Sequence, residues 1–316
     1  MAASVARAGF KIRLVDIDPM TMDYDYNLMR EIDFNPVMAV IACNLFGIAS
    51  DWNKLHEIVD GQSVFLIDDA AQSFGTTVNA RASGTLGDAG IYSLDRGKNL
   101  STWAGGVLLT DNDRLAEGIE KAIGSLPRPG IISEAVISLK MCLYSILLRP
   151  EYYWIPSMLP FLGLGETKYG EEFSLALLSR FQQDAGALLI DRLNLLNTHR
   201  SDCASQLVER IRPLSKFTIP GSHTSSDTTY LRVPVLAADQ VVLDRAIHLL
   251  REGGVVASAM YPATIRDIPG IEPRLAELDN NYPGGKQVVA RLFTLPTHYY
   301  VRQADIDRIV LILSKV

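Results

Sequence analysis

The chain has 316 residues and a mass of 34.8 kDa, which is enough for one large domain or two ordinary ones. Its apolar content of 48% and charged content of 21% exclude a disordered chain, a collagen-like chain and a coiled-coil protein. The net charge is −6 and no cluster of Lys and Arg occurs. Nucleic acid is therefore excluded as a partner, because phosphate binding needs concentrated positive charge.

The three cysteines, Cys43, Cys142 and Cys203, lie far apart and form no CxxC pair. This pattern argues against a disulfide framework and against a structural zinc site. We therefore expect no metal site and a cytoplasmic location.

Residues 11 to 111 alternate short apolar runs with helical or irregular connections. This rhythm is typical of βαβ units and predicts an α/β fold, with a mainly parallel sheet covered by helices on both faces. The expected helices are Asp51–Val59, with Asp51 as N-cap, and Asp113–Ile123. Four strands are expected to be fully buried, namely Ile12–Asp16, Val37–Cys43, Ser63–Ile67 and Gly90–Ser93. Gly106–Thr110 is expected as a further strand.

An apolar segment follows at residues 131–165, rich in Leu, Ile, Tyr, Trp and Pro. Its longest apolar run, Met141–Leu148, is too short to span a bilayer. Two interpretations stay open. The segment is a buried helical hairpin or dimer contact, or it is an anchor in the membrane interface. Interfacial helices usually carry a strongly basic polar face, which favours the first interpretation.

Three regions are expected in all: a large domain at 1–170, a long connecting helix at 171–212, and a small C-terminal α+β domain at 213–316. Apolar residues recur at three and four positions from Leu178 to Leu196, which predicts the connecting helix. The strands expected in the small domain are Thr229–Val235, Val255–Met260 and Leu292–Leu295. Its expected helices are Gln240–Arg251 and Ala304–Leu313.

Polar side chains follow two of the predicted strands. Asp69 comes after the run Ser63–Ile67, and Lys98 comes after Gly90–Ser93. Ligands of open α/β sheets bind at the carboxyl ends of the strands, so the carboxylate and the amine can face one pocket. A partly dry lysine can form a Schiff base, and a separate carboxylate can keep a pyridine nitrogen protonated, which together suit pyridoxal phosphate (PLP). Spacing alone, however, favours a surface salt bridge.

Four ordered sequence blocks resemble the DegT/DnrJ/EryC1/StrS family of fold-type-I, PLP-dependent sugar aminotransferases. They are LIDDAAQSFG at 66–75, GDAGIYSL at 87–94, GKNL at 97–100 and GGVLLT at 105–110. Matching intervals between the blocks make the resemblance specific. It extends over nearly the whole chain and is weakest across 125–175.

The resemblance implies a role for each matching residue. Lys98 would carry the cofactor and act as the catalytic base, and Asp69 would pair with the ring nitrogen. Gln72 would contact the ring hydroxyl and Ser93 would hold the phosphate. Three more residues are expected near the substrate: Arg96, Asn99 and His298. Arg96 can equally be an exposed loop arginine.

The chain also departs from the family pattern. Family members carry an additional N-terminal stretch with two core strands, a phosphate cradle at a helix N-terminus and an aromatic residue that stacks on the ring. We therefore expect an N-terminally truncated large domain. Leu175 and Leu177 replace polar residues of the family, and Asn44 stands where a histidine is common.

The expected function is amino transfer from L-glutamate to a nucleotide-linked keto sugar by a homodimer, in polysaccharide or glycan biosynthesis. Family members that act as sugar dehydratases have a histidine in place of the lysine, so Lys98 favours amino transfer. The alternative is a non-catalytic or truncated member that serves as a binding or regulatory subunit.

Overall fold

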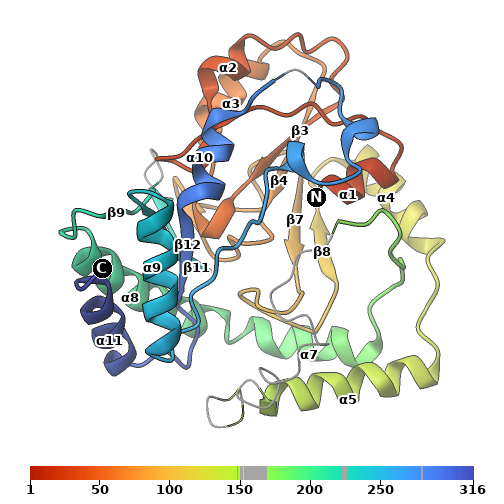
Figure 1. The fold of residues 1–316 in the computed structure, drawn as a ribbon. Coiled ribbons are helices and arrows are strands. Elements are labelled where there is room, and N and C mark those ends of the chain that lie inside the picture. Colours follow the sequence, from red (N-terminus) through yellow and green to blue (C-terminus); the bar gives the residue numbers. More distant parts are fainter. Residues whose placement is uncertain (148, 150–151, 153–168, 222–225, 279) are drawn as a thin grey trace.

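The computed structural model describes residues 1–147, 149, 152, 169–221, 226–278 and 280–316. A four-stranded sheet with the order β3-β4-β7-β8 lies at the centre of the large domain (Figure 1). Strands β3 (Ala39–Cys43), β4 (Phe65–Asp69) and β7 (Ala89–Ser93) run parallel, and β8 (Gly106–Leu109) is antiparallel to β7. The predicted mainly parallel α/β sheet is confirmed.

The parallel strands are buried on alternate residues, and the expectation that they are buried throughout was wrong. The buried side, which includes Val40, Ala42 and Leu66, packs with residues of α2 (Tyr26–Arg30) and α3 (Trp52–Val59). The opposite side of the strands is only half-buried. Asp51 caps α3 as predicted, because its carboxylate accepts a hydrogen bond from the backbone N–H of Lys54.

Two predicted strands are absent from the described chain. Ile12–Asp16 contributes only an isolated bridge between Ile12 and Leu275, and Val255–Met260 only a bridge between Ser258 and Thr294. Apolar runs of this length become strands only where a neighbouring strand offers a continuous hydrogen-bond ladder. Here each run meets its partner at a single residue.

The predicted connecting helix is two helices, α7 (Arg180–Ile190) and α8 (Leu193–Ile211). The chain turns between them, where the N–H of Arg192 bonds to the carbonyl of Leu189 three residues back. Both helices contact the loop that follows β7, through Gln182 on α7 and Asn197 on α8. α8 in addition buries Leu207 in the small domain. Residues 171–179 precede α7 and are not helical.

Helices α4 (Asp113–Gly124) and α5 (Ile131–Leu147) come between β8 and α7. α4 agrees with the prediction, and its N-cap is Asn112. α5 confirms a helix in the first half of the apolar segment, and it lies alongside α7 (Figure 1). Most of the rest of that segment, 148–165, lies outside the described residues.

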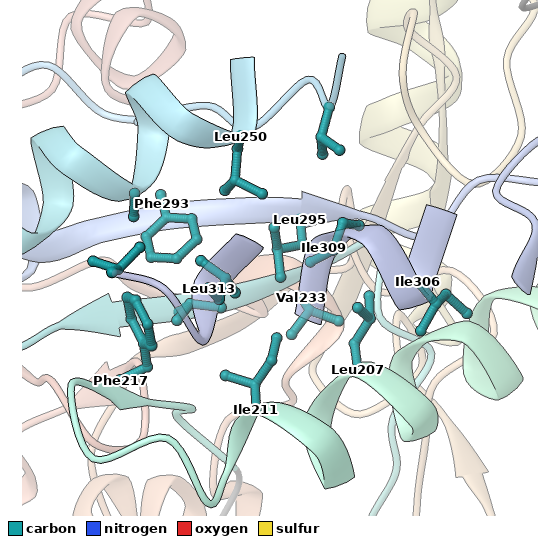
Figure 2. Packing of buried hydrophobic residues seen from close by; sticks show 14 of the residues in the cluster. Leu207, Ile211, Phe217, Val233, Leu250, Phe293, Leu295, Ile306, Ile309 and Leu313 are labelled. Atoms are coloured by element: carbon teal, nitrogen blue, oxygen red, sulfur yellow. The ribbon is translucent and has the colours of Figure 1, made fainter. Parts of the chain in front are cut away.

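The small domain has an antiparallel sheet with the order β12-β11-β9, covered by helices, as predicted. Its strands are β9 (Phe217–Thr218), β11 (Arg232–Ala237) and β12 (Leu292–Pro296). Its helices are α9 (Gln240–Glu252) and α11 (Gln303–Leu313), joined by α8. Figure 2 shows the core that they enclose, in which Phe293, Leu295, Val233 and Leu207 are fully buried.

The described chain also contains shorter elements. They are α1 (Ala2–Arg7), β1 (Ile17–Asp18), β2 (Asp23–Tyr24), β5 (Thr77–Val78), β6 (Arg81–Ala82), β10 (Ser226–Asp227) and α10 (Pro283–Arg291), with 3-10 turns at Leu45–Gly47, Ile265–Asp267 and Glu272–Arg274. β10 pairs with β5, so a strand from the C-terminal part of the chain joins one from the large domain.

The three cysteines are free thiols. Within the described ranges, no group of three or more His, Cys, Asp or Glu side chains could hold a metal ion. No helix of the described chain is long and apolar enough to cross a membrane.

We expect Leu207→Ala to lower the free energy of unfolding by about 2–5 kcal/mol, because it leaves a cavity in the small-domain core. Leu195→Ala is the matched control, since Leu195 is on the same helix but 64% exposed. It should change the free energy by less than about 0.5 kcal/mol. Urea denaturation followed by circular dichroism measures both. Equal losses in the two variants would contradict the packing.

Candidate active site

Two adjacent aspartates at the end of β4 point to opposite faces of the sheet. Asp68 is fully buried, and its carboxylate accepts hydrogen bonds from the N–H groups of Gly84 and Leu86 and from the side chain of Asn44. Side chains alternate along a strand, so Asp69 lies on the other, half-buried face. The Asp69 carboxylate accepts hydrogen bonds from the N–H of Ala71 at 3.1 Å and from the thiol of Cys43 at 3.7 Å.

The sheet register brings Ser93 to the same face as Asp69. Asp69 is paired with Cys43 on one side and with Ile91 on the other. Ser93 lies two residues beyond Ile91 and so points in the same direction. Its hydroxyl oxygen accepts a hydrogen bond from the N–H of Asp95 at 3.3 Å, which leaves the hydroxyl proton for an anion.

Lys98 lies in the loop that follows β7. The backbone turns from Asp95 to Lys98, where the Lys98 N–H bonds to the Asp95 carbonyl at 3.3 Å. Gly97, the third residue of this turn, has a φ of +75°, which a residue with a side chain rarely adopts. The turn carries the half-buried lysine back toward the carboxyl ends of the strands.

The loop is fastened to both connecting helices. Asn99 is 4% exposed, and its side-chain amide donates to that of Asn197 on α8 at 3.2 Å. The amide of Asn197 in turn donates to the carbonyl of Phe74, close to Gln72 in the chain. Gln182 on α7 donates to the carbonyls of Thr102 and Ala104. Asn99 was expected near the substrate, but its side chain faces the interior, where it holds the loop.

Asp69 ends β4, Lys98 follows the neighbouring strand β7, and the charges of the two side chains interact. Burial lowers the pKa of Lys98, and the negative charges of Asp69 and then Asp95 act in the opposite direction. In the described chain, no ion pair within 4.0 Å joins Asp69 to Lys98. The two charged groups therefore act on one another without direct ion-pair contact in the described chain.

Gln72 is held beside Asp69 by contacts with two other segments. Its side-chain carbonyl accepts from the N–H of Phe46 at 3.1 Å, and its amide donates to the hydroxyl of Tyr261 at 3.2 Å. Phe46 has a φ of +60°, an uncommon backbone conformation that the bond to Gln72 and the burial of its ring help to hold. Tyr261 brings the small domain into the site.

Cys43, Tyr24 and Tyr261 also belong to the cluster around Lys98 and Asp69, and the sequence did not identify them as site residues. Burial, followed by the charge of Asp69, raises the pKa of Cys43 to about 12. Burial also raises the pKa of Tyr24 and of Tyr261, and the charges of Cys43 and Asp69 raise both further. Cys43 was detectable as the last residue of the predicted strand Val37–Cys43, at the same edge of the sheet.

Arg96 and His298 lie at the periphery. The Arg96 guanidinium is 4.9 Å from the ring centre of Trp103 and pairs with the Asp95 carboxylate at 3.7 Å, on an exposed side chain. His298 is exposed at the protein surface, and its ring centre lies 6.2 Å from that of Tyr300. The structure therefore agrees with an exposed loop arginine at position 96.

The residues that depart from the family pattern have other roles here. Asn44 is 2% exposed and links the strand ends, because its amide donates to Asp68 and its carbonyl oxygen accepts from the N–H of Ser50. Leu175 is 47% exposed, and the N–H of Leu177 bonds to the carbonyl of Pro127. These leucines belong to the segment before α7.

Two surface hollows occur away from Lys98. Arg7, Glu171 and Arg274 line one, and Asp16 and Lys54 are among the residues that line the other. Neither is lined by Lys98, Asp69, Gln72 or Ser93, although Tyr24 lines the second. That cluster lies instead along the half-buried face of the sheet.

The donor set of the cluster fits PLP. It offers an amine with a lowered pKa, a carboxylate separated from it, a side-chain amide held by Tyr261, and a hydroxyl with a proton to donate. These are the groups that a pyridinium ring with an aldehyde, a hydroxyl and a phosphate requires.

A sequence profile described as "DegT/DnrJ/EryC1/StrS aminotransferase family" matches residues 1–140 and 160–314. The chain belongs to this family. The match leaves out residues 141–159, which include the C-terminal part of α5.

Two curated relatives illustrate the range of the family. The chain is 22% identical over 320 residues to UDP-2-acetamido-2-deoxy-3-oxo-D-glucuronate aminotransferase of Pseudomonas aeruginosa, covering 99% of this chain and 75% of the relative. It is 35% identical over 130 residues to a pleiotropic regulatory protein of Geobacillus stearothermophilus, covering 40% of this chain and 35% of the relative. The match thus spans about a third of the length of that protein.

The fold is also that of solved family members. The Escherichia coli GDP-4-keto-6-deoxy-D-mannose-3-dehydratase, solved with bound hydrated PLP, superimposes with a TM-score of 0.75 at 15% identity. The superposition covers 98% of this chain and 75% of the dehydratase. This likeness establishes the fold-type-I architecture.

We expect Asp69→Asn to lower the pKa of Lys98 further, because it removes the charge that most raises it. A larger fraction of neutral amine then reacts at a given mildly alkaline pH. Competitive acetylation of Lys98, quantified by mass spectrometry across a pH series, measures the midpoint. Asp95→Asn should act in the same direction. Asp111→Asn, an exposed carboxylate in the same domain, is the control. An unchanged or raised midpoint in Asp69→Asn would contradict the geometry.

Proposed function

We propose that the chain is a PLP-dependent aminotransferase that moves an amino group from L-glutamate to a keto sugar linked to a nucleotide. The observation that carries the proposal is the juxtaposition of Lys98 and Asp69. The carboxylate influences the lysine electrostatically without forming an ion pair with it in the described chain. Because the chain belongs to an aminotransferase family, we interpret this pair of side chains as a PLP-binding lysine and the aspartate that accompanies it.

Bound PLP supplies an electron sink that stabilises negative charge on the substrate carbon next to the transferred nitrogen. Lys98 provides the amine that attaches the cofactor, and its Nζ then accepts and returns the proton at that carbon. Its lowered pKa suits both tasks, since a neutral amine is the nucleophile and the base. Lys98 is thus the proposed catalytic residue.

Asp69 would stabilise positive charge at the ring nitrogen, and its carboxylate is oriented by the N–H of Ala71. Gln72 offers its amide toward the ring hydroxyl, and Tyr261 fixes the orientation of that amide. Ser93 donates its hydroxyl proton to the phosphate. Arg96 and His298 are proposed for the substrate, at the rim of the site.

The nucleotide-sugar substrate is proposed by analogy with the relatives, whose names specify a UDP-linked and a GDP-linked keto sugar. L-Glutamate as donor, a role in polysaccharide or glycan biosynthesis, a cytoplasmic location and a homodimer complete the proposal. Lys98 favours amino transfer over the dehydratase chemistry of the E. coli relative. The non-catalytic alternative is less favoured, because amine, carboxylate, amide and hydroxyl are all in place.

We expect Lys98→Ala to lose covalent attachment of PLP and to lower amino transfer from L-glutamate by more than about 1,000-fold, since the catalytic base is gone. Borohydride reduction after incubation with PLP, followed by peptide mass spectrometry, should find the adduct on Lys98 in the natural chain. Lys121→Ala, on the exposed surface of α4, is the control and should behave as the natural chain.

Two outcomes would contradict the proposal. An adduct distributed over exposed lysines but absent from Lys98 would remove the cofactor site. An adduct on Lys98 without formation of 2-oxoglutarate from L-glutamate would instead support the non-catalytic alternative.

A further inference from the structure

Helix α5 presents apolar residues to solvent, the reverse of an ordinary surface helix. Ile131 is 89% exposed, Ile132 81% and Leu139 61%. The inward side of α5 carries its contacts with the protein. Glu134 accepts a hydrogen bond from the N–H of Phe181 on α7, and Tyr144 packs edge-on against Trp103 at 5.5 Å between ring centres. α5 is therefore firmly attached through one side and uncovered on the other.

The exposed residues form a regular stripe. Ile132, Val136, Leu139, Leu143 and Ile146 follow one another at spacings of four, three, four and three, and each is at least 44% exposed. This is the spacing of the contact seam between two packed helices. The residues that flank the stripe are mainly small or apolar, namely Ser133, Ala135, Cys142 and Leu147, with Lys140 as the one charged member.

The stripe is complementary to itself when reversed. In an antiparallel pair of α5 helices centred on Leu139, Leu139 meets its own copy and Val136 meets Leu143. Ile132 then meets Ile146 of the other helix. Such isologous pairing is what a twofold axis requires. Lys140 is drawn aside by Trp103, whose ring centre lies 5.8 Å from its ammonium group, so it leaves the seam apolar.

The exposed apolar side chains are numerous enough for a contact between proteins. Six lie on α5, and the neighbouring α7 adds Phe181, which is 39% exposed, and Leu188, which is 71% exposed. Patches of this kind on a soluble chain mark interaction sites. A bilayer is the less suitable occupant, because interfacial helices bring a row of basic residues and α5 has Lys140 alone.

We propose that the outward stripe of α5 binds the same stripe of a second copy of this chain, as an antiparallel helix pair with its twofold axis at Leu139. The C-terminal part of α5, which carries Leu143 and Ile146, lies outside the region matched by the family profile. Through Tyr144 and Trp103, the contact also supports the loop that carries Lys98.

Site-directed cross-linking tests the axis directly. In a Cys142→Ser background, which removes the exposed thiol of α5, Leu139→Cys should form a disulfide-linked dimer on mild oxidation. Ser145→Cys, exposed on the same helix but off the stripe, should remain uncrosslinked. Mixing Ile132→Cys with Ile146→Cys should give a cross-linked pair in higher yield than either variant alone, as antiparallel pairing requires.

A second measurement does not depend on thiols. Leu139→Glu places a charge at the axis and should halve the mass measured by light scattering, while circular dichroism shows the fold unchanged. Halving is expected whether or not another interface also joins the copies. The matched control is Leu195→Glu on α8, where Leu195 is 64% exposed, and it should keep the mass of the natural chain.

Three results would overturn the proposal. They are equal cross-linking of Leu139→Cys and Ser145→Cys, an unchanged mass for a folded Leu139→Glu variant, and flotation of the uncrosslinked natural chain with phosphatidylglycerol vesicles that Leu139→Glu abolishes. The last result would assign the stripe to a bilayer.

Discussion

The buried carboxylate of Asp68 is the constraint on which the site depends. A charge without solvent is costly unless it is hydrogen-bonded, and burial raises the pKa of Asp68 even with its donors in place. The donors come from Asn44 and from the backbone of Gly84 and Leu86, which are three different points of the chain. Satisfying this one group fixes the end of β4 and the two segments beside it.

The position of Asp69 follows from that of Asp68. A strand alternates its side chains, so an inward Asp68 forces its neighbour to the opposite face, beside Cys43 and the side of β7 that carries Ser93. Lys98 reaches the same space from a turn that Gly97 permits. Two aspartates that are adjacent in sequence thus have different roles. The buried Asp68 stabilises the fold, whereas the half-buried Asp69 is available to bind the cofactor.

The sequence predicted most of the elements because their signals are local. The helix that begins after Asp51 and the helix that ends before Gly253 both form where they were expected. The four sequence blocks identified Asp69, Gln72, Ser93 and Lys98 as one group. The sequence could not predict the bend at Asp191 and Arg192, which depends on packing with distant parts of the chain. Nor could it predict that residues 12–16 form no strand, which depends on the lack of a continuous hydrogen-bond ladder. The inward direction of Asn99 and the contribution of Tyr261 were also hidden, because each rests on a partner far along the chain.

The bond between Asn99 and Asn197 joins residues that are 98 positions apart, and it lies next to the proposed catalytic lysine. A nascent chain that has not yet emerged as far as α8 lacks this fastening for its Lys98 loop, however complete its central sheet. The order of synthesis therefore separates two events. The sheet can assemble early, whereas the amine of Lys98 reaches its final position only when α8 docks. Contacts between residues far apart in sequence therefore determine how late in folding the chain becomes able to bind its cofactor.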